Sequence, residues 1–215
     1  IIARKKYGNK RFKYPLFTNR AFKKYKSFVL RNSGSDNNNS HFRDILMTSL
    51  VKNLNFDVQD YNSCIVYING NYWGIYHIRE KINEHFLKQH YGVKKDSIAI
   101  LKHKYDVQHY GRINYRDILK YLKKTKFKDK KEIDSLSKLI DIDNYLDYNI
   151  SQVYFNNIDA GGNIRYWRHR KKGSKWRWIM FDTDFGFHLR KENGYKDNSL
   201  DKFTKYNKQK WPIPP

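Results

Sequence analysis

Apolar and polar positions along this chain follow two periods, one typical of strands and one typical of helices. Two runs of aromatic and β-branched residues, 65–68 and 72–78, flank the dipeptide Asn69-Gly70. Because this pair accepts the positive φ angles of a two-residue turn, the pattern predicts an antiparallel hairpin. Alternation in 164–168 and 175–181, with a glycine-containing turn between the two runs, predicts a second hairpin.

Apolar residues spaced three and four positions apart predict helices in much of the remaining chain. The first helix is expected to begin at Ser40, a favourable N-cap residue. Further helices are predicted at 82–90, 112–124, 135–140 and 141–155, with short strands at 27–30 and 97–101 and a turn at 106–111. Together these elements predict an α+β fold. The face that the first helix is expected to bury consists of Phe42, Ile45, Leu46, Leu50 and Leu54.

Composition adds a strong basic charge to this picture. Lys and Arg number 44 against 21 Asp and Glu, a formal net charge of +23 in 215 residues, which favours anionic partners. The basic residues are spread along the chain without zinc-finger spacing or an RNA-binding aromatic motif, so the pattern does not favour specific nucleic-acid recognition. No apolar run is long enough to predict a transmembrane segment. The single Cys64 lies in an apolar run, which predicts a buried thiol.

Four polar side chains flank the second predicted hairpin. Asp159 and Asn163 follow the helix predicted at 141–155, and Asp182 and Asp184 follow the second strand. We expect the hairpin to bring these side chains together, because it joins the two segments that carry them. Carboxylate and amide oxygens are suited to holding a divalent metal on a phosphate. Capping and turn formation explain the same residue types, so both interpretations stay open.

Glu80 directly follows the first predicted hairpin, where the sheet meets the next helix. One candidate partner is Lys102, just past the strand predicted at 97–101. Protein kinases use a Lys–Glu pair to position nucleotide phosphates. An ordinary structural ion pair accounts equally well for the two residues.

Two upstream features also have two interpretations each. The loop 31–40 is rich in Ser, Gly and Asn, so it either covers a phosphate with its backbone N–H groups or serves as a solvated connector. Arg43 and Asp44 follow it, and they form either a surface salt bridge or part of a site.

Several strings resemble one protein family. Residues 66–76, VYINGNYWGIY, followed by Glu80, resemble the NGxYxGxYxxxE hairpin of the spore coat protein H (CotH-like) kinase family. Residues 157–167 with 176–187 are similar to that family's NxDxxxxNxxxWR…W…DxDxxF block, with one residue fewer between the first Asp and the Asn. The upstream strings RNSG and RD also resemble the family pattern, so the resemblance spans nearly the whole chain. The end at 211–215 looks like a point just short of the family's C-terminal helices.

The resemblance implies a divergent protein-kinase-like fold, a single CotH-like domain. Its N-terminal lobe, 1–105, would contain antiparallel hairpins, and its mainly helical C-terminal lobe, 106–215, would carry a metal-binding hairpin. It implies transfer of the ATP γ-phosphate to Ser or Thr of a protein substrate with Mg²⁺ or Mn²⁺. The residues it assigns are Asp159 as catalytic aspartate; Glu80, Lys102 (second choice Lys81) and Asn163 as nucleotide-binding residues; and Asp182, Asp184 and Asn163 as metal ligands. The triplet Asp184-Phe185-Gly186 spells a conventional kinase motif, whereas the family pattern favours Asp182 as the main ligand.

Three function classes follow from the sequence. The first is an active atypical protein kinase, and the second is a non-catalytic kinase-like surface or spore-coat protein. The third is a metal-dependent nuclease or nucleic-acid-binding protein that uses the acidic cluster and the basic charge. The resemblance further implies a spore-surface or exported setting, although the residues themselves leave the compartment open.

Overall fold

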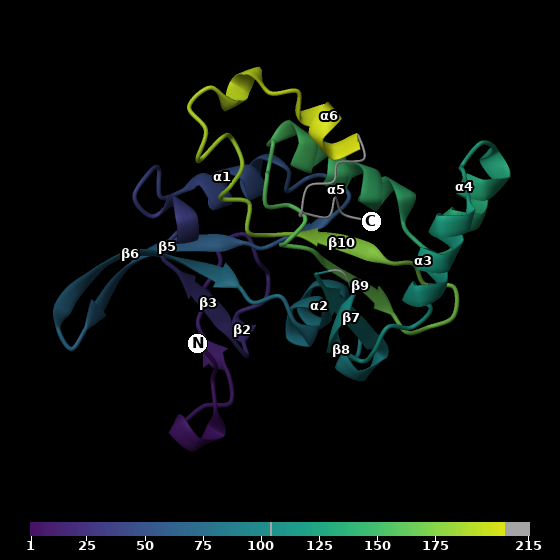
Figure 1. The fold of residues 1–215 in the computed structure, drawn as a ribbon. Helices are drawn as coiled ribbons and strands as arrows, with labels where there is room; N and C mark the ends of the chain where they lie inside the picture. Colours follow the sequence, from purple (N-terminus) through teal and green to yellow (C-terminus); the bar gives the residue numbers. More distant parts are fainter. Residues whose placement is uncertain (104, 205–215) are drawn as a thin grey trace.

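The computed structural model describes residues 1–103 and 105–204 and shows the expected α+β fold (Figure 1). The strands are β1 (Phe12–Lys13), β2 (Lys24–Tyr25), β3 (Phe28–Arg31), β4 (Asp57–Val58), β5 (Tyr61–Ile68), β6 (Asn71–Glu80), β7 (Ile98–Lys102), β8 (Asp106–His109), β9 (Arg165–His169) and β10 (Arg177–Met180). The α-helices are α1 (Arg43–Leu50), α2 (Glu84–Tyr91), α3 (Tyr115–Lys124), α4 (Lys130–Ser137), α5 (Ile142–Tyr154) and α6 (Ser199–Thr204). Short 3-10 turns occur at Lys5–Tyr7, Gly34–Asp36, Lys95–Ser97 and Gly194–Lys196.

The largest sheet has five strands in the order β4-β10-β9-β7-β8. β9 and β10 pair antiparallel with Trp167 opposite Arg177, which confirms the second predicted hairpin. β4 joins β10 in parallel, and β7 pairs antiparallel with both of its neighbours. The turn expected at 106–111 is wrong, because β8 forms there as an edge strand on β7. The sequence of this polar segment favours a turn, but pairing with β7 makes residues 106–109 a strand.

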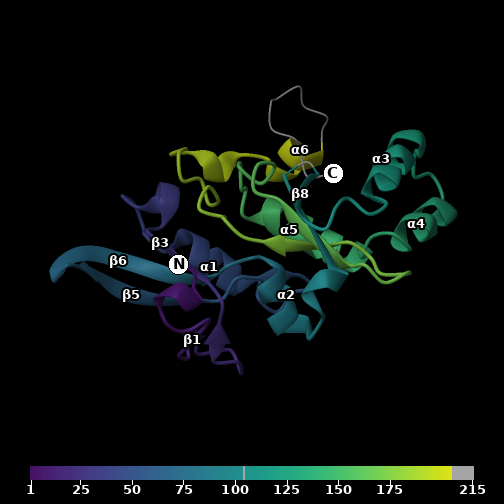
Figure 2. The same cartoon turned by 90° about the horizontal axis from the view of Figure 1, so that it is seen from below.

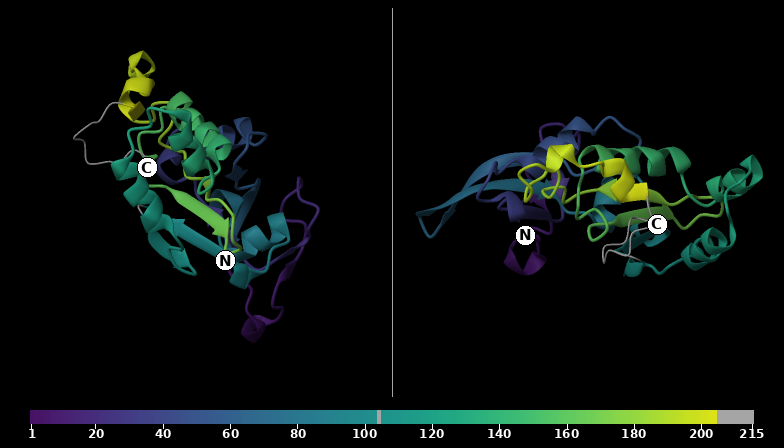
Figure 3. Two further views of the ribbon diagram at one scale, coloured as in Figure 1. Left: turned by 90° about the vertical axis from the view of Figure 1, so that its right-hand side faces the viewer. Right: turned by 45° about the horizontal axis from the view of Figure 1, so that its top comes forward.

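Helices cover both faces of this sheet, and the core lies between the layers. In β7, Ala99 and Leu101 pack on the face covered by α1, α3 and α5, whereas Ile98 and Ile100 pack on the face covered by α2. Successive strand residues point to opposite faces, so a continuous apolar run indicates a strand buried on both sides. Figure 2 shows α2 and α5 on opposite sides of the sheet, and α6 lies against α5 in Figure 3.

A second sheet, in the order β3-β6-β5, carries the long hairpin predicted from the Asn69-Gly70 pair. Both turn residues have positive φ, 52° for Asn69 and 83° for Gly70, as the sequence required. The hairpin extends away from the body of the molecule (Figure 1). Cys64 lies on β5 of this hairpin. Its side chain is half-buried, whereas the sequence predicted a buried thiol.

The first helix was placed correctly, but its buried face was predicted wrongly. Ser40 does not cap it; instead the Asp36 carboxylate accepts bonds from the backbone N–H groups of Ser40 (3.2 Å) and Arg43 (3.0 Å). The polar side chains of Asp44 and Thr48 are buried on this helix because they take part in a network described below. The residues that point inward are Asp44, Ile45, Met47, Thr48 and Val51, while Phe42, Leu46, Leu50 and Leu54 are exposed.

The other predicted helices form, one of them with a shift, and α6 forms where the sequence analysis predicted no helix. α2 begins after Asn83, whose side chain accepts the N–H groups of His85 and Phe86, and it ends at Gly92 in the left-handed conformation. α3 and α5 form within their predicted ranges. The helix predicted at 135–140 instead begins at Lys130, because Asp129 and Glu132 form a capping box inside the basic stretch.

The boundary expected between two lobes at residue 105 falls between two strands of one sheet. β7 and β8 lie on either side of that position and are hydrogen-bonded neighbours, and β4, β9 and β10 belong to the same sheet. Across the described ranges, no helix is long and apolar enough to cross a membrane. Residues 211–215, quoted above for the family resemblance, lie outside the described residues.

Candidate functional site

The segment that follows β10 is held in place by α1. The Asp44 carboxylate on α1 accepts hydrogen bonds from the Thr183 backbone N–H (2.9 Å) and from its hydroxyl (3.0 Å). Arg43 donates to the carbonyl oxygens of Gly186 (3.1 Å) and Phe187 (2.9 Å) farther along the same segment. Two consecutive residues of α1 therefore fix the chain around Asp182 and Asp184.

Arg31 joins the two aspartates that leave β10. Its Nη2 donates to Asp184 Oδ2 at 3.1 Å and also to Asp182 Oδ1. The Ser35 backbone N–H donates to the same Asp184 oxygen at 2.7 Å. Burial raises the pKa of Asp184, and the Arg31 charge opposes that rise. Asp182 has a positive φ of 58°, a conformation that aspartate tolerates better than most residues and that often marks functional sites.

Asp159 and Asn163 lie in the loop after α5, as the sequence predicted. The Asn163 Nδ2 donates to Asp159 Oδ2 at 2.6 Å, and the Asn163 backbone N–H donates to the Asp159 carbonyl. Burial, reinforced by the Asp182 charge, raises the pKa of Asp159. The Asp182 charge thus acts on Asp159, which links the two predicted acidic segments electrostatically. His103 anchors this loop, because its Nδ1 lies 2.7 Å from the Gly162 carbonyl oxygen.

A buried ion pair between Arg79 and Asp44 stabilises the carboxylate that holds Thr183. The Arg79 Nη1 donates to Asp44 Oδ2 at 2.6 Å, and the exposed fractions of the two side chains are only 1% and 5%. Burial alone would raise the pKa of Asp44, but the charges of Arg79 and Arg31 and the bonds from Thr183 hold that pKa below its usual value. The interpretation of Arg43 and Asp44 as a surface salt bridge is therefore wrong.

The loop 31–40 is exposed at 32, 34 and 37–39, as a solvated connector would be, but it also contacts the site. The Gly34 N–H approaches Asn32 Oδ1, the Asp36 N–H bonds to the Ser33 carbonyl, and the Ser35 N–H holds Asp184. These N–H groups are thus bound within the protein, and Ser33 and Asp36 are buried. The loop therefore holds a carboxylate of the site, and its role as a phosphate cover stays a prediction.

Replacing Gly34 with alanine should destabilise this arrangement by about 1–3 kcal/mol. Gly34 has a φ of +57°, and a Cβ at this position would lie 2.6 Å from Asp184 Oδ2 and 2.8 Å from Arg31 Nη2. Urea unfolding measures the loss. Gly173→Ala is a matched control, because Gly173 also has positive φ but a Cβ there meets nothing within 4 Å. Equal losses for the two variants would mean that backbone strain alone, and not the crowded site, sets the cost.

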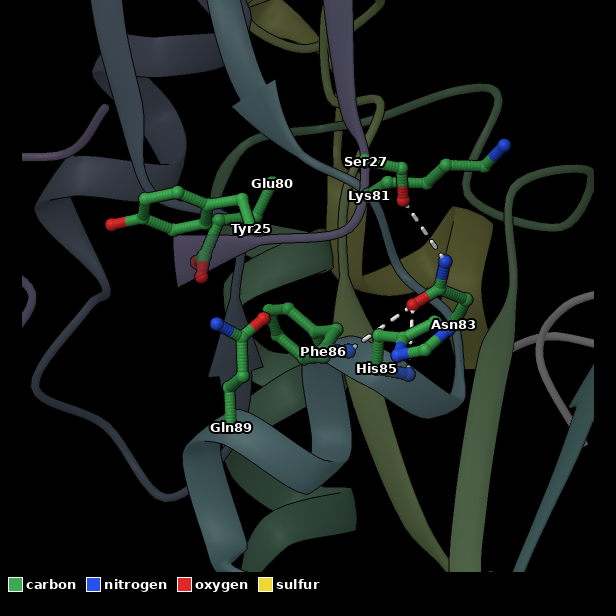
Figure 4. A pocket seen from close by; sticks show the side chains of 8 residues that line it. All are labelled: Tyr25, Ser27, Glu80, Lys81, Asn83, His85, Phe86 and Gln89. Atoms are coloured by element: carbon green, nitrogen blue, oxygen red, sulfur yellow. Dashed lines mark hydrogen bonds between the residues drawn. The ribbon is translucent and has the colours of Figure 1, made fainter. Parts of the chain in front are cut away.

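Glu80 lies apart from the partner that the sequence suggested. Its carboxylate accepts bonds from Arg20 Nη2 (2.9 Å) and the Asp60 N–H (2.9 Å), and it lies 2.8 Å from His90 Nε2. The expected pairing with Lys102 is therefore wrong. Figure 4 shows the small cavity of about 10 Å³ beside Glu80, a volume that holds one water molecule and no nucleotide. Lys81 extends away from the other side chains that line it (Figure 4).

Lys102 lies at the end of β7, directly opposite Arg165 on β9. Side chains of such cross-strand partners share one face of the sheet. Arg165 is in turn an electrostatic neighbour of Asp182. Lys102 thus shares a face of the sheet with Arg165, and it does not pair with Glu80.

The donor set suits a hard divalent cation brought with a nucleotide. The bonds described above use Asp159 Oδ2, Asp182 Oδ1 and Asp184 Oδ2, which leaves the second oxygen of each carboxylate outside them. Within the described ranges, no three His, Cys, Asp or Glu side chains form a ready-made metal cage. Mg²⁺ commonly uses one or two carboxylates and completes its shell with phosphate oxygens and water, so a pair of carboxylates meets its requirement.

Sequence reasoning found the four polar residues but missed Arg31, Thr183 and the burial of Asp44. Their only signal was the resemblance of the strings around Arg31 and Asp44 to a family pattern. A comparison with curated proteins finds no match to this chain. A comparison with family models finds the CotH kinase protein family over residues 2–213. Because that match covers nearly the whole chain, including every residue of the site, the chain belongs to the CotH kinase family.

Proposed function

We propose that this protein is an atypical protein kinase that transfers the γ-phosphate of ATP to Ser or Thr of a protein substrate with Mg²⁺ or Mn²⁺. The observation that carries the proposal is the meeting of Asp159 and Asn163 with Asp182 and Asp184 beside basic side chains. Phosphoryl transfer requires mainly the positioning of groups and the neutralisation of charge, and this set of residues supplies both.

Each residue has a role that its surroundings support. Asp159 accepts the proton of the substrate hydroxyl. Burial and the Asp182 charge raise the pKa of Asp159, so its carboxylate binds a proton more tightly than an exposed aspartate does. Asp182, Asp184 and the amide oxygen of Asn163 would hold the metal. The Asn163 amide nitrogen donates to Asp159 and so leaves that oxygen available. When bound, the metal supplies positive charge that neutralises the phosphates. Lys102 and Arg165 face the phosphates from the neighbouring strands.

A thermal-unfolding comparison tests this function. ATP with Mn²⁺ or Mg²⁺ should stabilise the wild-type chain by about 2.7 kcal/mol at a hundredfold excess over Kd, because the ligand binds only the folded state. The gain should require both nucleotide and metal, and it should disappear in Asp182→Asn. Asp143→Asn is a suitable control, since Asp143 is an exposed residue of α5 away from the site.

Two other results would contradict the proposal. Absence of any shift in the wild-type protein would favour a non-catalytic relative of the kinases. Binding of nucleic acid with a steep salt dependence, together with an absent nucleotide response, would favour the nuclease or nucleic-acid-binding class.

A further inference from the structure

Arg31 occupies the place between two aspartates in which a divalent cation would be expected. A single nitrogen, Nη2, bonds to both Asp182 Oδ1 and Asp184 Oδ2. The two aspartates leave the same strand, whereas Arg31 comes from β3, about 150 residues earlier in the chain. A guanidinium shared by two carboxylates neutralises charge that a metal would otherwise neutralise.

The Arg31 side chain is partly exposed, and one of its nitrogens has no hydrogen-bond partner. Its side chain is 22% exposed, so one side of it faces solvent. Its Nε has no hydrogen-bond partner and lies 3.8 Å from Asp44 Oδ2, an oxygen that already accepts the shorter bond from Arg79. Asp44 thus keeps the base of the Arg31 side chain close to the site even when its Nη2 changes partner.

We infer that Arg31 is the resident counter-cation of the Asp182–Asp184 pair and that it becomes a phosphate ligand when a metal–nucleotide complex binds. The inference rests on the proposed function. Once a metal takes the carboxylate oxygens, the positive guanidinium is next to a new positive charge and must turn away from it. The incoming phosphates are the anionic partners within its reach, and a guanidinium suits phosphate oxygens because it presents several N–H donors in one plane.

Mn²⁺ binding without nucleotide tests the displacement, with free Mn²⁺ counted by electron paramagnetic resonance. Arg31→Gln should bind Mn²⁺ about tenfold more tightly than wild type, because the competing charge-assisted hydrogen bonds are gone. Arg31→Lys should lie between the two, since lysine keeps the charge without the planar donor geometry. Mn²⁺ should also raise the melting temperature of Arg31→Gln more than that of wild type. In the presence of Mn²⁺, the extra stabilisation by ATP should be largely lost in Arg31→Gln.

Arg165→Gln is the matched control. Arg165 is also near Asp182, but its guanidinium packs 4.5 Å from the centre of the Phe181 ring, so the variant removes a nearby charge and no bond to Asp182 or Asp184. Equal gains in Mn²⁺ affinity for Arg31→Gln and Arg165→Gln would reduce the effect to general electrostatics and overturn the inference.

The Mn²⁺ measurements distinguish a failure of the Arg31 inference from a failure of the proposed function. If wild type binds Mn²⁺ with ATP but both Arg31 variants bind Mn²⁺ alone no better than wild type, the role of Arg31 is wrong and the proposed function stands. If no variant binds metal with or without ATP, the proposed function fails and this inference fails with it. Should Arg31→Gln not fold, Arg31→Lys alone decides, because it retains the positive charge beside Asp182 and Asp184.

Discussion

Replacing Asp44 with alanine should lower the free energy of unfolding by about 3–5 kcal/mol, the usual cost of removing one partner of a buried ion pair. The variant leaves Arg79 without its 2.6 Å partner at 1% exposure of its side chain. It also removes the acceptor of the Thr183 N–H and hydroxyl, so the segment that carries Asp182 and Asp184 loses its attachment to α1. Denaturant unfolding followed by circular dichroism measures the loss.

Asp117→Ala provides the control for this prediction. Asp117 also faces a basic side chain, Lys120, at 3.8 Å, but both side chains are at least 70% exposed. Exposed pairs of this kind contribute about 0–1 kcal/mol. A loss below about 1 kcal/mol for Asp44→Ala would show that the buried network does not hold the fold together.

Replacing Asp159 with asparagine should lower the rate of phosphotransfer by about 10²–10⁴-fold, the range typical for loss of a general base. Asparagine keeps the size of the side chain and can still bond to Asn163, so nucleotide and metal binding should change little. The initial rate of label transfer from ATP to a Ser- and Thr-rich protein, at saturating ATP and Mn²⁺, measures the effect. Asp143→Asn should leave that rate unchanged. A rate for Asp159→Asn within twofold of wild type would remove Asp159 from the catalytic role.

The same substitution should raise stability near neutral pH. The pKa of Asp159 is raised in the folded state, first by burial and then by Asp182, so the folded protein holds this proton more tightly than the unfolded chain does. The contribution is favourable below the unfolded pKa and is lost as pH rises through the folded pKa. The stability of Asp159→Asn relative to wild type should therefore increase from acid to neutral pH. If the difference in stability between Asp159→Asn and wild type did not change from acid to neutral pH, it would contradict a raised pKa of Asp159 in the folded protein.

Local chemistry in the sequence determined most elements of this protein. The positive φ angles required at Asn69-Gly70, the Asn83 cap and the left-handed Gly92 are properties of residues acting on their nearest neighbours. The alternation that predicted β9 and β10 is equally local, because a strand points successive side chains to opposite faces. The order of α5, the Asp159 loop and the β9–β10 hairpin also predicted that Asp159 and Asp182 lie near one another, since a hairpin returns the chain to its starting point.

Tertiary structure alone decided the features that depend on distant residues. α1 was expected to bury its most apolar face, yet Asp44 is buried because Arg79 and Thr183, 35 and 139 positions away in the chain, complete its hydrogen bonds. The polar segment of β8 is a strand because it pairs with the edge of β7. Glu80 contacts Arg20 and His90, whereas the sequence suggested Lys102 as its partner. A buried charge is stable only when its partners are present, and no local pattern encodes which distant residues those partners are. The pairing of Arg31 with Asp182 and Asp184 belongs to this second group as well.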